Sequence, residues 1–483
     1  MITQGSDQHH PVRDLSAAAG FGDLGDFTDS SRSALGYDRM STDGRLTRAL
    51  STRDLAVYYL SSLVGVGVLV VPGIALSKAG PASLLAWVIL WVASLPIAVT
   101  FARFSARYPS AGGVSFLVRQ AFGWRPGTAI GLFLLFLNLS TNPILGLAAA
   151  RYLAALFGWE GEAPLLLGGF AVMSLGVLTN LLGIVLASRL QFALVVTLVV
   201  SLVTVALVSS PAADPGRLTP FAPNGWWAVG AAIVVCFFSF FGWENVAHAA
   251  EEVRDPQRSY PRAALIAASG LGLLYTGLAL AVVLIVPVGA DTDTNAVLSA
   301  MLFVSHGETA GRVGAALAVV LLVITTNAWV LGASRLLFAM SRDGAVTRRL
   351  ARVSGRNGTP TAALLVAWAC YAIDFGVLAL IGGDESGLIP FTAASILVIY
   401  IATFAAGLRL FGQPRVVVPC AAALVAVTAF LAVGGWASVW ALVAFAIVAG
   451  YVWLRPQPPG DPAADEAQLP VPAETETPGA PRV

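Results

Sequence analysis

The chain has 483 residues, of which 57% are hydrophobic and 11% are charged, with a mean hydropathy of +0.78. Soluble domains carry about 25% charged residues, so this composition excludes a soluble enzyme or a secreted disulfide scaffold and predicts an integral membrane protein. The net charge of +1 leaves no basic field for a nucleic acid, and the three cysteines show neither disulfide nor metal spacing.

The two ends of the chain differ from its middle. Residues 1–50 are polar and lack the apolar core of a signal peptide, and residues 457–483 are rich in proline and acids, so both are predicted to be disordered cytoplasmic tails. A spanning helix needs about 20 apolar residues, and residues 51–456 have room for twelve. The windows are 55–77, 79–102, 126–150, 163–188, 190–213, 218–243, 263–290, 313–334, 357–383 (interrupted only by Asp374), 386–408 and 416–454, which divides in two at Gly434-Gly435.

The basic residues predict the orientation of these spans. With a cytoplasmic N-terminus, 24 of the 28 Lys and Arg residues fall on the inside and 4 (Lys78, Arg151, Arg217 and Arg312) on the outside. Cytoplasmic loops carry the excess of basic residues. We therefore expect a multi-pass protein of the plasma (inner) membrane, embedded in the lipid bilayer with both termini cytoplasmic.

Two windows contain glycines at their centres and predict interrupted helices. The first reads SSLVGVGVLVVP, with Gly65-Val66-Gly67, and the sixth reads FFSFFGWEN, with Gly242. These windows lie five helices apart and enter the membrane from opposite sides, a pattern typical of inverted-repeat transporters that bind substrate at the midplane. A break at Gly65–Gly67 would present N–H groups to a carboxylate, and one at Gly242 would expose carbonyls to an ammonium group. The alternative for the glycines is close helix packing.

Glu244 is a carboxylate inside an apolar run. Such residues usually face a cavity or a partner, and an apolar environment favours the uncharged form of a carboxyl group, so Glu244 is a candidate proton carrier. The alternative is a structural carboxylate that connects two helices. His248 lies four residues later on the same helical face, and a hydrogen-bonding residue at the helix end is the simpler interpretation of it than a proton shuttle.

Several segments resemble the amino acid–polyamine–organocation (APC) superfamily of transporters. They are Phe237–Ala263, with its aromatic pair, glycine, glutamate and a later EVRDPQRSYP; the Gly-x-Gly run that ends at Pro72; YPSAGGVSFLVRQAFG after the second window; and SRLLFAMSRDG at the end of the eighth. Around Glu244 the chain most resembles bacterial methionine and branched-chain amino acid exporters.

The resemblance implies an all-helical fold in which two inverted repeats of five helices, about 54–210 and 226–410, are followed by two extra helices at about 415–455. It implies that helices 1 and 6 are discontinuous. Backbone at Gly65, Val66 and Gly67 would bind the substrate carboxylate. The remaining implied site residues are Phe240, Phe241, Gly242 and Trp243 near the amino group, Phe238 and Trp243 beside the side chain, and Asn327 and Trp329 on helix 8.

The chain also departs from its relatives. Phe116 replaces a tyrosine at a gating position, and residues 189–210 lack the lysine that stands in for sodium in some proton-coupled relatives. Thr325 and Thr326 are candidate sodium ligands, and threonine back-bonding to the helix is their alternative. Three further features have structural alternatives to a functional role: Asp374, the helix-3 polar residues Asn138, Thr141 and Asn142, and the loop arginines Arg254, Arg258 and Arg262.

Together these features predict a secondary amino acid transporter, a permease that works as an exchanger or exporter by alternating access. Its substrate would be a neutral or hydrophobic amino acid and its coupling ion a proton carried by Glu244. The alternatives are a sodium-coupled importer and a transporter-like membrane protein that senses or anchors a partner. We expect no enzymatic activity, cofactor or metal, because the sequence shows no nucleophile–base pair, metal cluster or phosphate loop.

Overall fold

The computed structural model describes residues 51–108, 113–182, 188–244, 253, 255–288, 295–342, 344–351 and 360–455. All of them belong to one compact unit that begins at residue 48. The predicted tails lie outside the described residues, as do His248 and Arg254.

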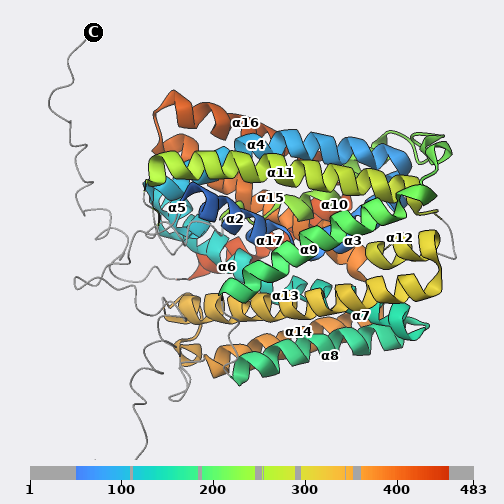
Figure 1. Cartoon of the computed structure of the whole chain (residues 1–483). Helices are drawn as coiled ribbons and strands as arrows, with labels where there is room; N and C mark the ends of the chain where they lie inside the picture. The colour runs from blue at the N-terminus through green and yellow to red at the C-terminus, as the bar shows by residue number, and fades with distance from the viewer. Residues whose placement is uncertain are drawn as a thin grey trace, which may run out of the picture. The chain divides into compact units, whose positions relative to one another are not determined.

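The described residues confirm the predicted all-helical fold (Figure 1). Within them, nine helical stretches are long and apolar enough to cross a membrane, and three shorter apolar helices accompany these. The exact number of twelve spans stays a prediction. The main helices are α2 (Thr52–Leu63), α3 (Val66–Ala79), α4 (Ser83–Arg107), α5 (Gly113–Phe122), α6 (Trp124–Thr141), α7 (Pro143–Phe157), α8 (Glu162–Leu181), α9 (Ser188–Ser209), α10 (Trp227–Phe237), α11 (Pro256–Ile285), α12 (Val297–His306), α13 (Glu308–Arg342), α14 (Thr361–Ile381), α15 (Glu385–Leu410), α16 (Pro414–Val433) and α17 (Trp436–Leu454), and the short 3-10 helix η4 is Phe238–Phe240.

Two of these helices, α5 and α12, lie in segments that the apolar windows do not include. Both have 10 residues, too few to span a bilayer. In α5 the buried residues are Val114, Leu117, Val118 and Ala121, which is the spacing of one helical face. That face packs against α6 and α15. A search for long charge-free runs misses both helices because each lies in an apolar run shorter than the roughly 20 residues of a span: Arg119 interrupts α5, and α12 ends two residues before Glu308.

The long helices pack in antiparallel and crossed pairs. Helices α4 and α11 run side by side along their length (Figure 1), and α7 packs on both α8 and α13. The α7–α8 contact is a close approach of two backbones. A Cβ atom on Gly146 would lie 2.5 Å from the carbonyl oxygen of Gly169. Small residues allow this approach, which in a membrane replaces hydrophobic association with dense van der Waals contact.

Gly146→Ala is therefore expected to destabilise the protein. The added methyl group meets backbone that cannot move aside, and overpacking of this kind costs about 1–3 kcal/mol. The measurement is the thermal unfolding midpoint of detergent-purified protein. Gly376→Ala is the matched control, since Gly376 lies within α14 and nothing stands within 4 Å of an added Cβ. An unchanged midpoint for Gly146→Ala would show that the two helices can separate without loss.

Candidate functional site

The first predicted interruption is present, one residue earlier than the glycine pattern suggests. Helix α2 ends at Leu63, Val64 is extended, and Gly65 is the N-cap of α3. The Tyr275 hydroxyl of α11 donates to the carbonyl oxygen of Leu63 at 3.0 Å, which satisfies one of the carbonyls that the break leaves open. Val66 and Gly67 are helical, in the first turn of α3.

The second interruption lies at Phe241-Gly242. Helix α10 continues into η4, which ends at Phe240, and Phe241 is extended. Gly242 has a φ of +118°, a backbone conformation that a side chain would strain. Its N–H donates to the hydroxyl of Tyr400 on α15 at 3.3 Å. The glycine is therefore required by the geometry of the break.

The two interruptions are in contact. Gly67 of α3 lies against Ser239 of η4, so closely that a Cβ on Gly67 would be 2.7 Å from the Ser239 Oγ. We call residues 64–67 and 238–242 the helix junction. The first N–H groups of α3 lack partners within their helix, as do the last carbonyls of the α10–η4 unit. These ends carry opposite partial charges, which suits a zwitterion.

Ser239 adds a further polar group to the junction. Its side chain is 2% exposed, and its Oγ has no hydrogen-bond partner in the described part of the chain. A buried hydroxyl without a partner is costly. A hydroxyl beside the first turn of α3 can donate, together with the N–H groups of that turn, to one anionic group.

Glu244 follows the second break and is half-buried. The Tyr400 hydroxyl donates to its Oε2 at 2.5 Å, and the same hydroxyl accepts the N–H of Gly242. Tyr400 thus connects the carboxylate to the backbone of the break. Phe101 and Phe404 pack on the Tyr400 ring, with centroids at 4.8 and 5.7 Å.

A small cavity opens beside Glu244. It holds about 30 Å³ and is lined by Glu244, by Phe101 and Phe104 of α4, by Phe116 of α5 and by Thr403 of α15, among others. A volume of this size holds a water molecule or two and is too small for an amino acid. Phe116, a candidate gating residue from the sequence, therefore lines the same space as Glu244.

The predicted aromatic residues divide into two groups. Phe238, Phe241 and Trp329 form a row from the junction to α13, with ring centroids 5.5 Å apart for the first pair and 5.9 Å for the second. Phe240 and Trp243 face other neighbours: the Phe240 ring lies 5.3 Å from Tyr275 of α11, and the Trp243 ring 5.6 Å from Tyr59 of α2. Both are fully buried in these contacts.

A family model described as amino acid permease matches residues 50–463. The chain belongs to the amino acid permease family. It is 30% identical over 411 residues to the uncharacterized amino acid permease YecA of Bacillus subtilis, covering 85% of this chain and 96% of the relative. It is 30% identical over 394 residues to the L-methionine/branched-chain amino acid exporter YjeH of Escherichia coli, covering 80% and 91%. The branched-chain amino acid permease BcaP of Bacillus subtilis is 25% identical over 353 residues, covering 66% and 72%. These relatives are transporters, which supports amino acid transport by a multi-pass membrane protein rather than enzymatic catalysis.

Three predicted residues on α13 have hydrogen-bond partners outside the junction. The Asn327 side chain donates to Thr179 at 2.9 Å and accepts from Asn180 at 2.9 Å, so it joins α13 to α8. Thr325 and Thr326 each donate to the carbonyl four residues earlier, at 2.8 Å. That is the back-bonding alternative for the two threonines.

The predicted polar residues Asn138, Thr141 and Asn142 also have hydrogen-bond partners. Asn138 and Thr141 donate to carbonyls of their own helix, and Asn142 donates to the Tyr371 hydroxyl at 3.1 Å. Asp374 lies one turn after Tyr371 on α14, and its Oδ2 has no hydrogen-bond partner in the described part of the chain. In the loop after the second break, Arg258 forms an exposed ion pair of 3.9 Å with Asp255. These contacts connect neighbouring segments and do not extend to the junction.

Sequence reasoning missed Ser239 and Tyr400. Ser239 stands between two phenylalanines of the quoted motif, and its hydroxyl was the only signal. Tyr400 is 156 residues from Glu244. Its one signal was a phenol in the middle of a charge-free window, and buried tyrosine hydroxyls usually have a partner.

Proposed function

We propose that the permease is a secondary active transporter that binds a neutral, hydrophobic amino acid at the helix junction and works by alternating access. The contact between the two interrupted helices carries this proposal. Twelve spans, built as two inverted repeats of five helices plus two, place such a junction near the midplane. Asymmetry of the basic residues supports cytoplasmic termini in the plasma membrane.

The junction can bind both charges of an amino acid through backbone. The N–H groups at Val66 and Gly67, with the Ser239 hydroxyl, would hold the carboxylate. The carbonyls around Phe238 and Phe241 would hold the ammonium group. Helix dipoles favour both contacts, and they leave the substrate side chain free to be selected elsewhere.

The aromatic row provides that selection. Phe238, Phe241 and Trp329 are apolar groups beside the junction, and Glu244, the acid that follows the second break, already accepts a hydrogen bond from Tyr400. A cationic side chain would need a free carboxylate there. The row therefore favours a neutral, hydrophobic substrate, and methionine and the branched-chain amino acids, for which YjeH is named, agree with this choice.

Coupling to protons is assigned to Glu244. Its carboxylate lies between the junction and the cavity, so a proton can reach it without passing through the substrate. Export or exchange fits the relation to YjeH, which is named an exporter. A proton on Glu244 would change its hydrogen bond with Tyr400 and hence the position of Gly242.

A thermal-shift screen of purified protein against the amino acids tests substrate binding, because a ligand of the folded state raises the melting temperature. We expect methionine, leucine, isoleucine and valine to raise it, and arginine, lysine and glutamate to leave it unchanged. Proteoliposome transport in sodium-free buffer then separates proton from sodium coupling. Stabilisation by none of the amino acids, or by cationic ones alone, would contradict the assigned substrate class.

Trp329→Ala is expected to weaken binding of a hydrophobic amino acid by about tenfold to a hundredfold, since truncating an aromatic anchor of a binding site costs about 1.4–2.8 kcal/mol. The measurement is the Kd from the thermal shift or a radioligand. Trp368→Ala is the matched control. Trp368 lies on α14, and its Nε1 donates to Ser174 of α8 at 3.0 Å. Its ring contact is with Phe170, which is not part of the aromatic row. Equal affinities in the two variants would remove Trp329 from the site.

A further inference from the structure

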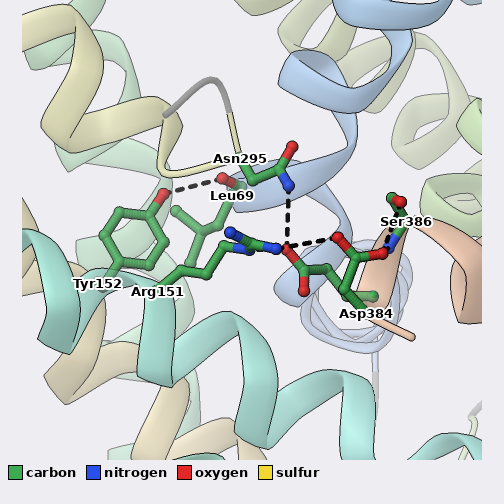
Figure 2. A network of polar contacts seen from close by, with 7 residues as sticks. Leu69, Arg151, Tyr152, Asn295, Asp384 and Ser386 are labelled. Carbon is green, nitrogen blue, oxygen red and sulfur yellow. Dashed lines mark hydrogen bonds and ion pairs between the residues drawn. The ribbon is translucent and has the colours of Figure 1, made fainter. Parts of the chain in front are cut away.

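A cluster of charged residues joins the C-terminal part of α7 to the start of α15. Arg151 of α7 pairs with Asp384 at 3.0 Å and with Glu385. Asn295, which precedes α12, donates to the same Oε1 of Glu385 at 3.0 Å. Figure 2 shows Arg151 and Asn295 converging from different elements on the acids at the start of α15.

Burial sets this cluster apart from the other ion pairs of the described chain. The Glu385 side chain is 1% exposed and that of Arg151 18%, whereas the acid of every other pair, Arg217–Asp214, Arg258–Asp255 and Arg312–Glu308, has more than half of its side chain exposed. Removing two charges from water costs free energy that their attraction does not reliably return. A contribution to stability therefore does not explain why these charges are buried.

The acids also have local contacts that fix their positions. The Asp384 Oδ1 accepts from the N–H and the hydroxyl of Ser386, at 3.0 and 2.6 Å, and so caps α15. Glu385 is in the first turn of α15, where the helix dipole favours a negative charge. Both carboxylates are thus held ready for a cation supplied by another helix.

The next residue of α7 extends the connection to the interrupted helix. The Tyr152 hydroxyl donates to the carbonyl oxygen of Leu69 in α3 at 2.8 Å (Figure 2). It also accepts the N–H of Leu298 in α12 at 3.4 Å. Two adjacent residues, Arg151 and Tyr152, therefore fasten α7 to α3, to α15 and to the segment around α12. For a path to open at this end of the bundle, α7 would have to separate from α3, from α15 and from the segment around α12.

The cluster and the cavity lie at opposite ends of α15. Thr403, which lines the cavity beside Glu244, is 18 residues after Glu385, about 27 Å along a helix at 1.5 Å per residue. One end of α15 is thus fastened by buried charges while the other borders a cavity. A transporter with alternating access is closed at one end at a time. The difference between the two ends of α15 is what such a transporter would show when it is closed at the α7–α15 end.

We propose that Arg151, Asp384, Glu385 and Asn295 form a latch that closes the α7–α15 end of the transport path and opens once in every cycle. This rests on the proposed transport by alternating access. Breaking the latch shifts the population toward the conformation that is open at this end, because a closing contact made in only one of two states biases their equilibrium.

Thiol labelling tests the latch without any substrate. Ala148 is fully buried on α7, three and four residues before Arg151 and Tyr152 and hence one turn deeper on the same face. Ala148→Cys, in a protein whose native cysteines Cys236, Cys370 and Cys420 are replaced, reports opening through its reaction rate with a membrane-impermeant maleimide. We expect Glu385→Gln to raise that rate about tenfold, which corresponds to a tenfold larger open population.

Glu308→Gln is the matched control, because it removes the same charge from an exposed pair, Glu308–Arg312, at 2.7 Å. Its labelling rate should equal that of the parent. Equal rates for Glu385→Gln and Glu308→Gln would overturn the latch. The labelling rates can be measured without any transport, so they test the latch independently of the proposed function.

A cross-link supplies a second test that does not depend on how well Glu385→Gln folds. In the same cysteine-free background, Arg151→Cys with Glu385→Cys is bridged by a short bis-thiosulfonate reagent and released by reductant. We expect bridging to stop transport and reductant to restore it. Transport that continues at the same rate through bridged protein would overturn the latch, whereas absence of transport in the cysteine-free parent would count against the proposed function.

Discussion

Glu244→Gln is expected to leave substrate binding measurable and to abolish transport driven by a pH gradient. Glutamine has nearly the shape of glutamate, and its amide oxygen can still accept the Tyr400 hydroxyl that lies 2.5 Å from Oε2. It cannot take up a proton. With one proton moved per substrate, a gradient of one pH unit supports a substrate gradient of up to about tenfold, because each 1.4 kcal/mol is tenfold. Proteoliposomes containing the variant should show no such gradient.

Asp374→Asn is the matched control for this experiment. Asp374 is also an acid within a span, but it lies on α14 beside Tyr371 and away from both interruptions. We expect pH-driven transport to continue in Asp374→Asn, and exchange of labelled for unlabelled substrate to continue in both variants. Full pH-driven accumulation by Glu244→Gln would end the assignment of the proton to this residue.

Charge placement predicts the helices of this permease well because a long apolar run has few alternatives in a bilayer. Each charge-free window contains helix in the described residues, and the division at Gly434-Gly435 falls between α16 and α17. Helices α5 and α12 were missed, since charged residues leave each of them an apolar run too short for a span. Their positions depend on the helices that pack against them, which no local pattern encodes.

The candidate site is less predictable because its parts come from distant segments. The glycines of residues 65–67 predict a break, but Gly65 alone lies in it, and Gly67 serves the close approach to Ser239. The two interpretations of the motif therefore apply to different glycines: Gly65 lies at the helix break, and Gly67 allows close packing. Asn327 and Trp329 stand two residues apart on α13, about 200° around a helix, so only one of them can face the junction.

Long-range polar contacts cannot be predicted from the sequence of this chain. Arg151 entered the prediction only as one of four outside basic residues, and Glu385 only as the boundary of a window. They lie 234 residues apart and meet because α7 and α15 converge at one end. Pairings of this kind follow from the fold and cannot be deduced from the composition of either helix.

Gly67→Ala is expected to lower transport and substrate affinity together. The added Cβ would stand 2.7 Å from the Ser239 Oγ and 3.1 Å from its Cα, so rotation of the serine side chain alone cannot remove the clash. The two interrupted helices must move apart, and overpacking of a close contact costs about 1–3 kcal/mol. If all of this free energy is lost from substrate binding, the Kd rises about tenfold to a hundredfold. The measurements are the Kd by thermal shift and the initial rate in proteoliposomes.

Gly277→Ala separates this effect from the general response of a helix to alanine. Gly277 lies within α11, and nothing stands within 4 Å of an added Cβ there. Alanine in a helix interior is favoured over glycine by about 1 kcal/mol, so this control should unfold at the same or a higher temperature and keep the parental Kd. If Gly67→Ala also keeps the parental Kd, the close approach of α3 and η4 does not shape the binding site, and the substrate must be held elsewhere along the interrupted helices.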